Sequence, residues 1–292
     1  MKTRFEQTRQ ARRIHGGWCN LFGATLGVRL SRCPIPAALR PRVYRALYGS
    51  KYEALDEDDL EKPLHEFRSI NELFTRGVRS ERRPIADNAE RQFIAPCDST
   101  VQDIGRLRND TILTVKDISY QISSLAPGTD VGDFHDGQFA ILFLSPRDCH
   151  RVFSPQNGTL TAMTHVPGYR LLVHPPYQRP EFPVFTLNER LVMELTTPLG
   201  RCLLIMIAGW GVGHITHPFP SKLKPHPRNI RRIELESPRL LQAGDWLATF
   251  ELGSTVVLIT EGDCPVQQSV HCGDTLRYGE SLFSEDNVDE AS

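Results

Sequence analysis

Apolar residues along this chain follow two different spacings, and the change falls near residue 77. Before it, apolar positions recur at helical spacing between prolines, which predicts helices over 36–48, 57–64 and 70–74. From Phe93 onward, short apolar or alternating runs are separated by turn residues, as is typical of strands. The strands that we expect lie at 111–115, 138–143, 191–195, 203–208 and 233–236, with a pair within 246–260.

The pattern therefore predicts an α+β fold in three parts. An α-helical N-terminal region covers residues 1–80, a mostly-β body covers 81–284, and a short acidic tail covers 285–292. Within the body, the run Pro198-Leu-Gly is expected to turn the chain between two strands. Two proline-rich stretches, 173–183 and 218–227, are expected to be loops that could line a site.

Charge is balanced over the whole chain but not along it. The net charge is −1 for 292 residues, yet the first fifty residues are rich in arginine and contain a single acid, Glu6. The segment 17–30 places several large apolar side chains roughly on one side of a helix: Trp18, Leu21, Phe22, Leu26 and Val28. Such a helix binds the surface of an anionic membrane, or it packs on the body as an ordinary amphipathic helix, and the pattern alone favours neither.

Cysteine usage and hydropathy bear on the compartment. The seven cysteines are scattered without a Cys-x-x-Cys pair, which argues for a reducing compartment. We expect neither a secretory signal nor a membrane-spanning helix, because no continuous apolar run of the required length is present. The expected location is peripheral, on the cytoplasmic face of a bacterial inner membrane, although an arginine-rich start is also compatible with mitochondrial targeting.

The tetrapeptide Leu252-Gly253-Ser254-Thr255 interrupts the strand pair expected within 246–260. A glycine inside a strand commonly marks a β-bulge. Alternatively, the Ser254 hydroxyl attacks the Gly253 carbonyl and converts the peptide bond into an ester. β-Elimination then cleaves the chain and leaves a pyruvoyl group, and a glycine at the scissile position removes the Cβ that would crowd the attack.

Several further motifs occur in a fixed order with this tetrapeptide. They are Ser69-Ile-Asn-Glu-Leu-Phe-Thr-Arg, Arg83-Pro-Ile, Ala95-Pro-Cys-Asp-Ser, Leu144-Ser-Pro-Arg-Asp-Cys-His-Arg-Val, Val166-Pro-Gly and Asn188-Glu-Arg. From about Phe67 to Gly279 the chain resembles the phosphatidylserine decarboxylase family. The resemblance implies a carboxy-lyase that converts phosphatidylserine into phosphatidylethanolamine and CO2, and a body built as a lipoyl-carrier-like sheet assembly.

The resemblance also implies how the enzyme matures. The proenzyme would cleave itself between Gly253 and Ser254 into a long chain, 1–253, and a short chain, 254–292, whose first residue becomes the pyruvoyl cofactor. The two products would remain together as a heterodimer, and a dimer of these pairs is left open. A pyruvoyl group provides the electron sink that pyridoxal phosphate provides elsewhere, and we see no lysine in a recognisable pyridoxal phosphate setting.

Three residues are the catalytic candidates. Ser254 is the nucleophile of self-cleavage and the source of the cofactor. Asp98 matches the carboxylate that, in the family, activates the serine through a histidine, and on structural grounds alone it would be a turn residue. His150 is the candidate general acid that protonates the carbanion, and on structural grounds alone it would be a buried histidine at a strand start.

The sequence departs from the family at one position of this relay. The family's relay histidine lies three residues after the first, in His-Arg-Val-His, whereas this chain has Phe153 there. His150 serves both steps, or another histidine such as His165 or His174 reaches the site, or maturation is slow or lost. The last alternative would make the chain a binding or scaffold protein.

Other functions receive less support from the sequence. A soluble pyruvoyl-dependent decarboxylase of a free amino acid keeps the same chemistry without the membrane. We expect no metal, because the pair His214 and His217, with His226 further on, has short spacing and no cysteine or glutamate that completes a ligand set. No phosphate loop or nucleic-acid module is recognisable, so the expected partners are a phospholipid substrate and an anionic membrane surface.

Overall fold

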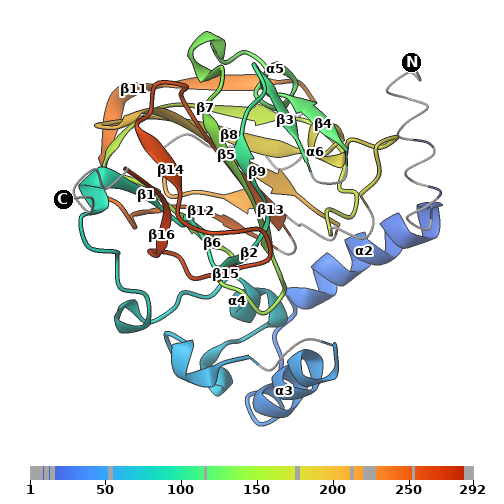
Figure 1. Ribbon diagram of the computed structural model, residues 1–292. Helices are drawn as coiled ribbons and strands as arrows, with labels where there is room; N and C mark the ends of the chain where they lie inside the picture. The colour runs from blue at the N-terminus through green and yellow to red at the C-terminus, as the bar shows by residue number, and fades with distance from the viewer. Residues whose placement is uncertain are drawn as a thin grey trace.

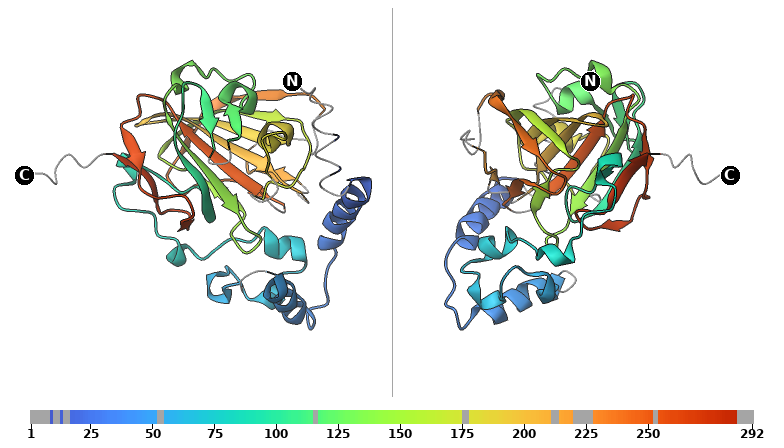
Figure 2. Two further views of the ribbon diagram at one scale, coloured as in Figure 1. Left: turned by 45° about the vertical axis from the view of Figure 1, so that its right-hand side comes forward. Right: turned by 90° about the vertical axis from the view of Figure 1, so that its left-hand side faces the viewer.

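The computed structural model describes residues 9, 13, 17–51, 55–114, 117–174, 178–210, 214–219, 228–251 and 254–285. It confirms the α+β fold with a β-rich body and mainly N-terminal helices. Figures 1 and 2 show helices α2 and α3, in blue, beside and below the body rather than within it.

The N-terminal region is helical, but its elements do not all have the predicted bounds. They are α2 (Gly17–Ser31), α3 (Arg40–Lys51), the 3-10 turns η1 (Glu57–Asp59) and η2 (Leu64–Glu66), and α4 (Ile70–Phe74). The helix predicted over 57–64 is wrong, since it is replaced by two single turns with Pro63 immediately before the second. By contrast, α4 has its predicted bounds because the Ser69 hydroxyl caps it by accepting from the Glu72 N–H at 3.1 Å.

The body is organised around an eight-stranded sheet whose pairs are all antiparallel. Its strands, in spatial order, are β11 (Arg231–Leu241), β7 (Gly158–Val166), β8 (Arg190–Thr197), β9 (Gly200–Ala208), β13 (Ser254–Thr260), β5 (Gln138–Leu144), β2 (Ser99–Arg106) and β15 (Thr275–Leu276). The predicted turn at 198–200 joins β8 to β9, and Gly200 there has a φ of 114°, which favours glycine.

Three smaller sheets complete the body. One is ordered β10 (Ile215–Thr216), β12 (Trp246–Phe250), β6 (Arg151–Phe153); a second is ordered β1 (Gln92–Ile94), β16 (Ser281–Glu285), β14 (Val266–Gln268); the third pairs β3 (Thr111–Leu113) with β4 (Ser119–Gln121).

The two faces of the large sheet are both buried, so strands such as β13 are buried at every position, with a continuous apolar run at 256–259 rather than an alternation with polar residues. Val256 and Leu258 face one core together with Val152 of β6 and Phe250 of β12. Val257 and Ile259 face the other core, which also contains side chains of α5 (Ile122–Leu125), α6 (Val184–Leu187), β3 and β4. In Figure 1, α5, α6, β3 and β4 lie together in the upper part of the body. The small sheet β10-β12-β6 therefore covers the face opposite to these helices.

Two neighbouring segments of chain, which we call crossings, each connect a strand of the large sheet to a strand of this small sheet. Strands β5 and β13 are paired in the large sheet, and their chain neighbours β6 and β12 are paired in the small one. The first crossing runs from Leu144 to His150 and the second from Phe250 to Ser254. They are held together at both ends, since Leu144 pairs with Ser254 and the Phe250 N–H donates to the His150 carbonyl at 3.0 Å. The candidate residues Ser254 and His150 thus lie on two adjacent crossings.

Candidate functional site

Ser254 is the first residue of β13 and lies in the middle of the large sheet. It pairs with Leu144 of β5 on one side and with Ala208 of β9 on the other. The residue is fully buried, and its hydroxyl has no hydrogen-bond partner among the described residues. A buried hydroxyl without a partner is costly, and such groups are commonly reactive. Leu252 and Gly253 lie outside the described residues, so the predicted cleavage bond is not described.

His150 ends the crossing from β5 and is also fully buried. Its Nδ1 lies 2.9 Å from the Asp148 carbonyl oxygen, which can only accept a hydrogen bond, so the proton resides on Nδ1 and the lone pair on Nε2. Nε2 has no hydrogen-bond partner among the described residues. Burial lowers the pKa of His150 to about 3, the bond to Asp148 opposes this in part, and the charge of Arg76 adds to the lowering. The imidazole is therefore neutral at physiological pH, and its Nε2 lone pair has no hydrogen-bond partner among the described residues.

Asp98 lies directly before β2 in a buried ion pair with Arg83. The Arg83 Nη2 lies 2.6 Å from Asp98 Oδ2 and its Nε lies 3.0 Å from Oδ1, so the pair is bidentate. Arg83 also reaches Asp59 at 2.8 Å, and the Tyr278 backbone N–H donates to Asp98 at 2.9 Å. The structure does not bring Asp98 into hydrogen-bond contact with His150 or Ser254; its oxygens are satisfied by an arginine and a backbone amide.

Phe153 belongs to a small apolar cluster beside Asp98. Its ring stacks on Tyr278 at 3.9 Å between ring centroids and an interplanar angle of 20°, and Cys149 and Val78 complete the cluster. Burial raises the pKa of Tyr278 to about 12, so its hydroxyl stays protonated. A phenyl ring can neither accept nor donate the proton that the family's histidine would transfer at this position.

A second buried carboxylate lies on the other side of Ser254. Glu189 accepts from His165 through Oε1 at 3.0 Å and from Arg170 through Oε2 at 3.0 Å, and the side chains of Glu189 and His165 are each only 2% exposed. The sequence analysis named His165 as a candidate relay histidine but gave no role to Glu189. Its presence in the motif Asn188-Glu-Arg was the available signal.

The remaining histidines are distributed around this group. His174 packs its ring against Phe143 at 5.1 Å, and Phe143 pairs with Thr255, whose side chain points to the face opposite to that of Ser254. His214 precedes β10, is half-buried, and has a buried Nδ1 without a partner among the described residues. Burial lowers the pKa of His214 and, with the charge of His214, lowers that of His217 to about 4. His226 lies outside the described residues.

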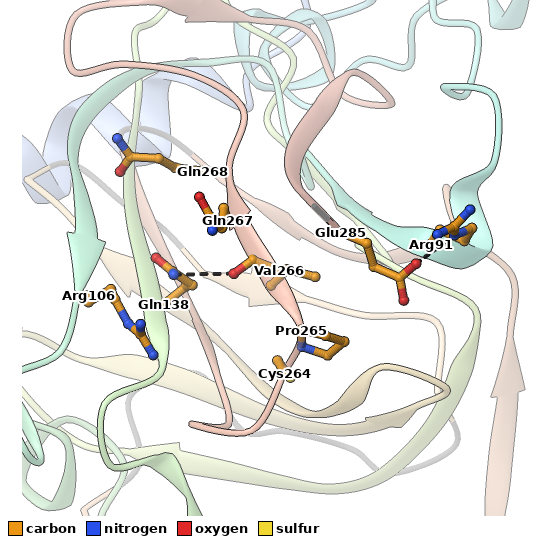
Figure 3. A pocket seen from close by; sticks show the side chains of 9 residues that line it. All are labelled: Arg91, Arg106, Gln138, Cys264, Pro265, Val266, Gln267, Gln268 and Glu285. Carbon is orange, nitrogen blue, oxygen red and sulfur yellow. Dashed lines mark hydrogen bonds and ion pairs between the residues drawn. The ribbon is translucent and has the colours of Figure 1, made fainter. Parts of the chain in front are cut away.

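Two further observations concern metal binding and a hollow in the body. In the described part of the chain, no group of three His, Cys, Asp or Glu side chains is arranged to hold a metal ion. A hollow of about 650 Å³, drawn in Figure 3, lies at the far end of β5 from Leu144, and some of its polar groups are paired with one another. Arg91 pairs with Glu285, and the Gln138 amide donates to the Val266 carbonyl. This hollow is therefore separate from Ser254 and His150.

The chain is similar to known proteins over most of its length. The sequence profile of a family described as phosphatidylserine decarboxylase matches residues 70–284. A phosphatidylserine decarboxylase proenzyme from Anaeromyxobacter sp. (strain K) is 32% identical over 260 residues, which cover 86% of this chain and 89% of the relative. Another from Acidovorax ebreus (strain TPSY) is 35% identical over 248 residues, which cover 82% and 84%.

The class of protein follows from these matches and from the buried serine and imidazole at the two crossings. The chain is an enzyme of the carboxy-lyase class, a decarboxylase. It belongs to the phosphatidylserine decarboxylase family.

Proposed function

We propose that the chain cleaves itself between Gly253 and Ser254 and then decarboxylates phosphatidylserine at a membrane surface, using a pyruvoyl group derived from Ser254. The observation that supports this most is the Ser254 hydroxyl, which is fully buried at a strand start without a hydrogen-bond partner in the described residues. The relatives' names, phosphatidylserine decarboxylase proenzyme, state both the substrate and a precursor form.

Cleavage proceeds in three steps. The Ser254 oxygen attacks the Gly253 carbonyl carbon, an ester C–O bond forms, the peptide C–N bond breaks, and the hydroxyl proton ends on the released nitrogen. Loss of the Ser254 Cα proton then expels the Gly253 carboxylate and leaves a dehydroalanine residue. This residue takes up water and loses ammonia, which gives a pyruvoyl group at the start of β13.

The residues around Ser254 fit that group. Once bound in the chain, a pyruvoyl group supplies an electron sink for the carbanion that forms when CO2 leaves. Ala208 and Leu144 flank Ser254 with apolar side chains of the same core. A site of this kind excludes water, so it protects the carbanion and strengthens electrostatic interactions.

We assign the final protonation to His150. Its Nδ1–H is held by the Asp148 carbonyl, so Nε2 is the nitrogen that carries a transferred proton. Burial disfavours the imidazolium, which makes it a strong acid as soon as it forms, and transfer to the carbanion is then favourable. Phe74 of α4 holds the ring in place, with 3.9 Å between the ring centroids. Asp98, bound to Arg83, fixes the chain beside this crossing through the Tyr278 amide.

Peripheral membrane association is part of the proposal, on the cytoplasmic face of a bacterial inner membrane. No helix in the described ranges is long and apolar enough to cross a bilayer. Helix α2 instead exposes Phe22, Leu26 and Leu30 at helical spacing, with Phe22 71% exposed. This stripe differs from the predicted one, because Val28 is half-buried and Leu30 takes its place. Trp18 and Leu21 have side chains outside those described.

Helix α3 repeats the same feature. Leu39, directly before the helix, and Val43 and Leu47 within it are exposed at intervals of four residues, and a neighbouring hollow of about 710 Å³ is lined mainly by basic residues. The basic residues are Arg40, Lys62, His65 and Arg68, beside Glu66 and Glu72. Apolar stripes next to basic side chains suit the boundary between acyl chains and anionic headgroups.

The first experiment is the intact mass of freshly purified protein under denaturing conditions, followed by CO2 release from two substrates. We expect two chains that end at Gly253 and begin at Ser254, the short one lacking a free amine, and CO2 from phosphatidylserine vesicles. A single chain of full mass, with no CO2 from either substrate, would leave the non-enzymatic alternative. Release from free serine but not from vesicles would favour the soluble decarboxylase.

Membrane binding is tested separately by sedimentation with vesicles. Binding to vesicles that contain phosphatidylglycerol should exceed binding to phosphatidylcholine vesicles. Phe22→Asp combined with Leu26→Asp should abolish it, because both side chains would place a charge in the apolar layer. Leu240→Asp is the matched control, since Leu240 is 79% exposed on β11 of the body and should not affect sedimentation.

A further inference from the structure

With Phe153 in place of the relay histidine, the residue that takes the Ser254 proton during self-cleavage has to come from elsewhere. The Asp98 side offers no imidazole, since the carboxylate is bound by Arg83 and the Tyr278 amide. His150 is a poor acceptor for this step, because burial holds its pKa at about 3 and no described carboxylate bonds to the ring. The proton acceptor should therefore lie on the side of Ser254 that faces β9.

Two other histidines are excluded by their strand and face. His174 contacts Phe143, whose side chain shares a face with Thr255 and not with Ser254. His165 shares the face of Ser254 but lies on β7, three strands away, which is about 14 Å between backbones. Neither can contact the Ser254 hydroxyl directly.

Glu189 is closer and is in register with Ser254. Ser254 pairs with Ala208, and the Ala208 N–H donates to the Glu189 carbonyl at 2.9 Å, so the three residues form one row across the sheet. Residues in one row point to the same face. The residue between the other two is an alanine, so no large side chain from the sheet separates the Ser254 hydroxyl from the Glu189 carboxylate. The two backbones are about 10 Å apart, which leaves room for one imidazole ring.

His214 is in position to supply that ring. Its carbonyl accepts from the Glu251 N–H at 2.9 Å, which fixes it beside the second crossing, three residues before Ser254. Its side chain interacts electrostatically with Glu251, Glu189, His165 and Arg170, so it lies near the carboxylate row. The charge of His217 is also close. Nδ1 of His214 is buried and has no hydrogen-bond partner in the described part of the chain.

We propose that His214 accepts the Ser254 hydroxyl proton during self-cleavage and that Glu189 stabilises the resulting imidazolium. This inference rests on the proposed function, because it concerns the maturation of the same site. The relay then comes from the β9 and β8 side of the sheet instead of the β5 and β2 side.

The proton transfer requires no group other than Ser254, Gly253 and His214. As the Ser254 oxygen bonds to the Gly253 carbonyl carbon, its proton moves to Nδ1 of His214. As the peptide C–N bond breaks, the same proton passes to the released Ser254 nitrogen, and His214 returns to its neutral form. Arg170 and His165 keep Glu189 in place, so the carboxylate acts only through its charge.

The test measures the rate at which newly synthesised full-length chain is converted into two chains. His214→Gln should slow conversion roughly 100-fold, because general base catalysis contributes about that much. His217→Gln is the matched control: His217 is also half-buried and is two residues past Ile215, but its Nδ1 already accepts from the Phe219 N–H at 3.2 Å, so conversion should be unchanged. His214→Asn serves where glutamine impairs folding, and urea denaturation of each variant reports folding.

A second variant separates a proton acceptor from a structural residue. Phe153→His, added to His214→Gln, restores an imidazole on the Asp98 side and should recover conversion by about tenfold or more. If wild-type chain matures and His214→Gln matures at the same rate, the proposal is overturned while the proposed function stands. If His214→Gln slows conversion and the added Phe153→His does not restore it, His214 has a structural role, and the proposal is again overturned. Wild-type chain that never cleaves removes the proposed function and the inference together.

Discussion

Ser254 has a buried carboxylate on either side of it, and the two are equally far along the sheet. Asp98 directly precedes β2, two strands from β13 across β5, and Glu189 directly precedes β8, two strands away across β9. Both carboxylates are also paired with an arginine. The two sides differ in what stands between the carboxylate and the serine.

On the Asp98 side, Arg83 is only 4% exposed and binds the carboxylate with two nitrogens, while Phe153 and Tyr278 fill the space beside it. On the Glu189 side, Arg170 uses one nitrogen, His165 takes the other oxygen, and the small Ala208 adjoins Ser254. The two sides therefore differ in whether an imidazole has room beside the carboxylate. A carboxylate in the predicted position is therefore insufficient evidence for a working relay.

The largest effect should come from removing the Ser254 hydroxyl, which lies between the Asp98 side and the Glu189 side of the sheet. Ser254→Ala should abolish chain cleavage and decarboxylation, because the attacking hydroxyl belongs to the residue directly after the scissile bond and alanine has none. Intact mass and CO2 release measure both losses. Thr255→Val is the control, since this neighbouring buried hydroxyl points to the opposite face and its removal should leave cleavage intact. Two chains in the Ser254→Ala protein would contradict the site altogether.

The next largest effect should distinguish the role of His150 from that of His214. His150→Gln should mature normally but lose about 10²- to 10⁴-fold in decarboxylation rate, because it removes the acid without touching His214. The fraction of cleaved chain and the CO2 release rate are measured on the same sample. Equal losses in both would mean that His150 serves both steps and that the two sides do not divide the work.

Stability should distinguish the two arginines. Arg83→Met should lower the free energy of unfolding by about 3–5 kcal/mol, because it leaves Asp98 buried without its charged partner. Arg170→Met should cost less, since Glu189 keeps its contact with His165. Urea denaturation of the two variants gives the comparison directly. A larger loss for Arg170→Met would reverse the roles assigned to the two ion pairs.

The pH dependence of stability should report the buried imidazole of His150. The unfolded chain binds this proton near pH 6.5, whereas the folded chain does so only at about 3. The folded state therefore loses stability as the pH falls below 6.5, by about 1.4 kcal/mol per pH unit for this group. Denaturation at pH 6.5 and 5.0 should show a shallower decline for His150→Gln than for wild type. Parallel declines would mean that His150 is more accessible to protons than its burial indicates.

The smallest effect is expected where α2 meets the second crossing. Arg32, the residue directly after α2, forms an ion pair with Glu251, and the Arg32 side chain is half exposed. Arg32→Ala should change the free energy of unfolding by less than about 1 kcal/mol, since exposed ion pairs contribute little. A loss several times larger would show that α2 supports the Glu189 side of Ser254 as well as membrane binding.

Local sequence was sufficient to predict much of the fold, and it supplied the candidate site residues that remain predictions. Strand patterns identified β5, β8, β9, β12 and β13 because their apolar runs are bounded by turn residues. The helix expected over 57–64 was wrong because Pro63 and the acidic run before it favour single turns. Ser254 and His150 were found from motifs, since each sits in a distinctive local sequence.

The meeting of Glu189 with His165, and the approach of His214, could not be predicted in the same way. Alternation along a strand indicates which residues share a face, but not which strands are neighbours. Placing β13 between β9 and β5 determines that Ser254, Ala208 and Glu189 form a row, and this depends on long-range pairing. The ion pair between Arg83 and Asp98 could not be predicted either, because nothing in the local sequence around Asp98 indicates an arginine partner.

The position of β13 has a consequence for the two products of cleavage. The short chain would contribute β13 to the middle of the large sheet, β15 to its edge beside β2, and β14 and β16 to a sheet shared with β1. Its strands are interleaved with those of the long chain rather than docked on a separable surface. Dilution should therefore not separate the products, because dissociation would require unfolding of both. Because unfolding would release two chains, the unfolding midpoint of the cleaved protein should rise with protein concentration, whereas that of an uncleaved chain would not.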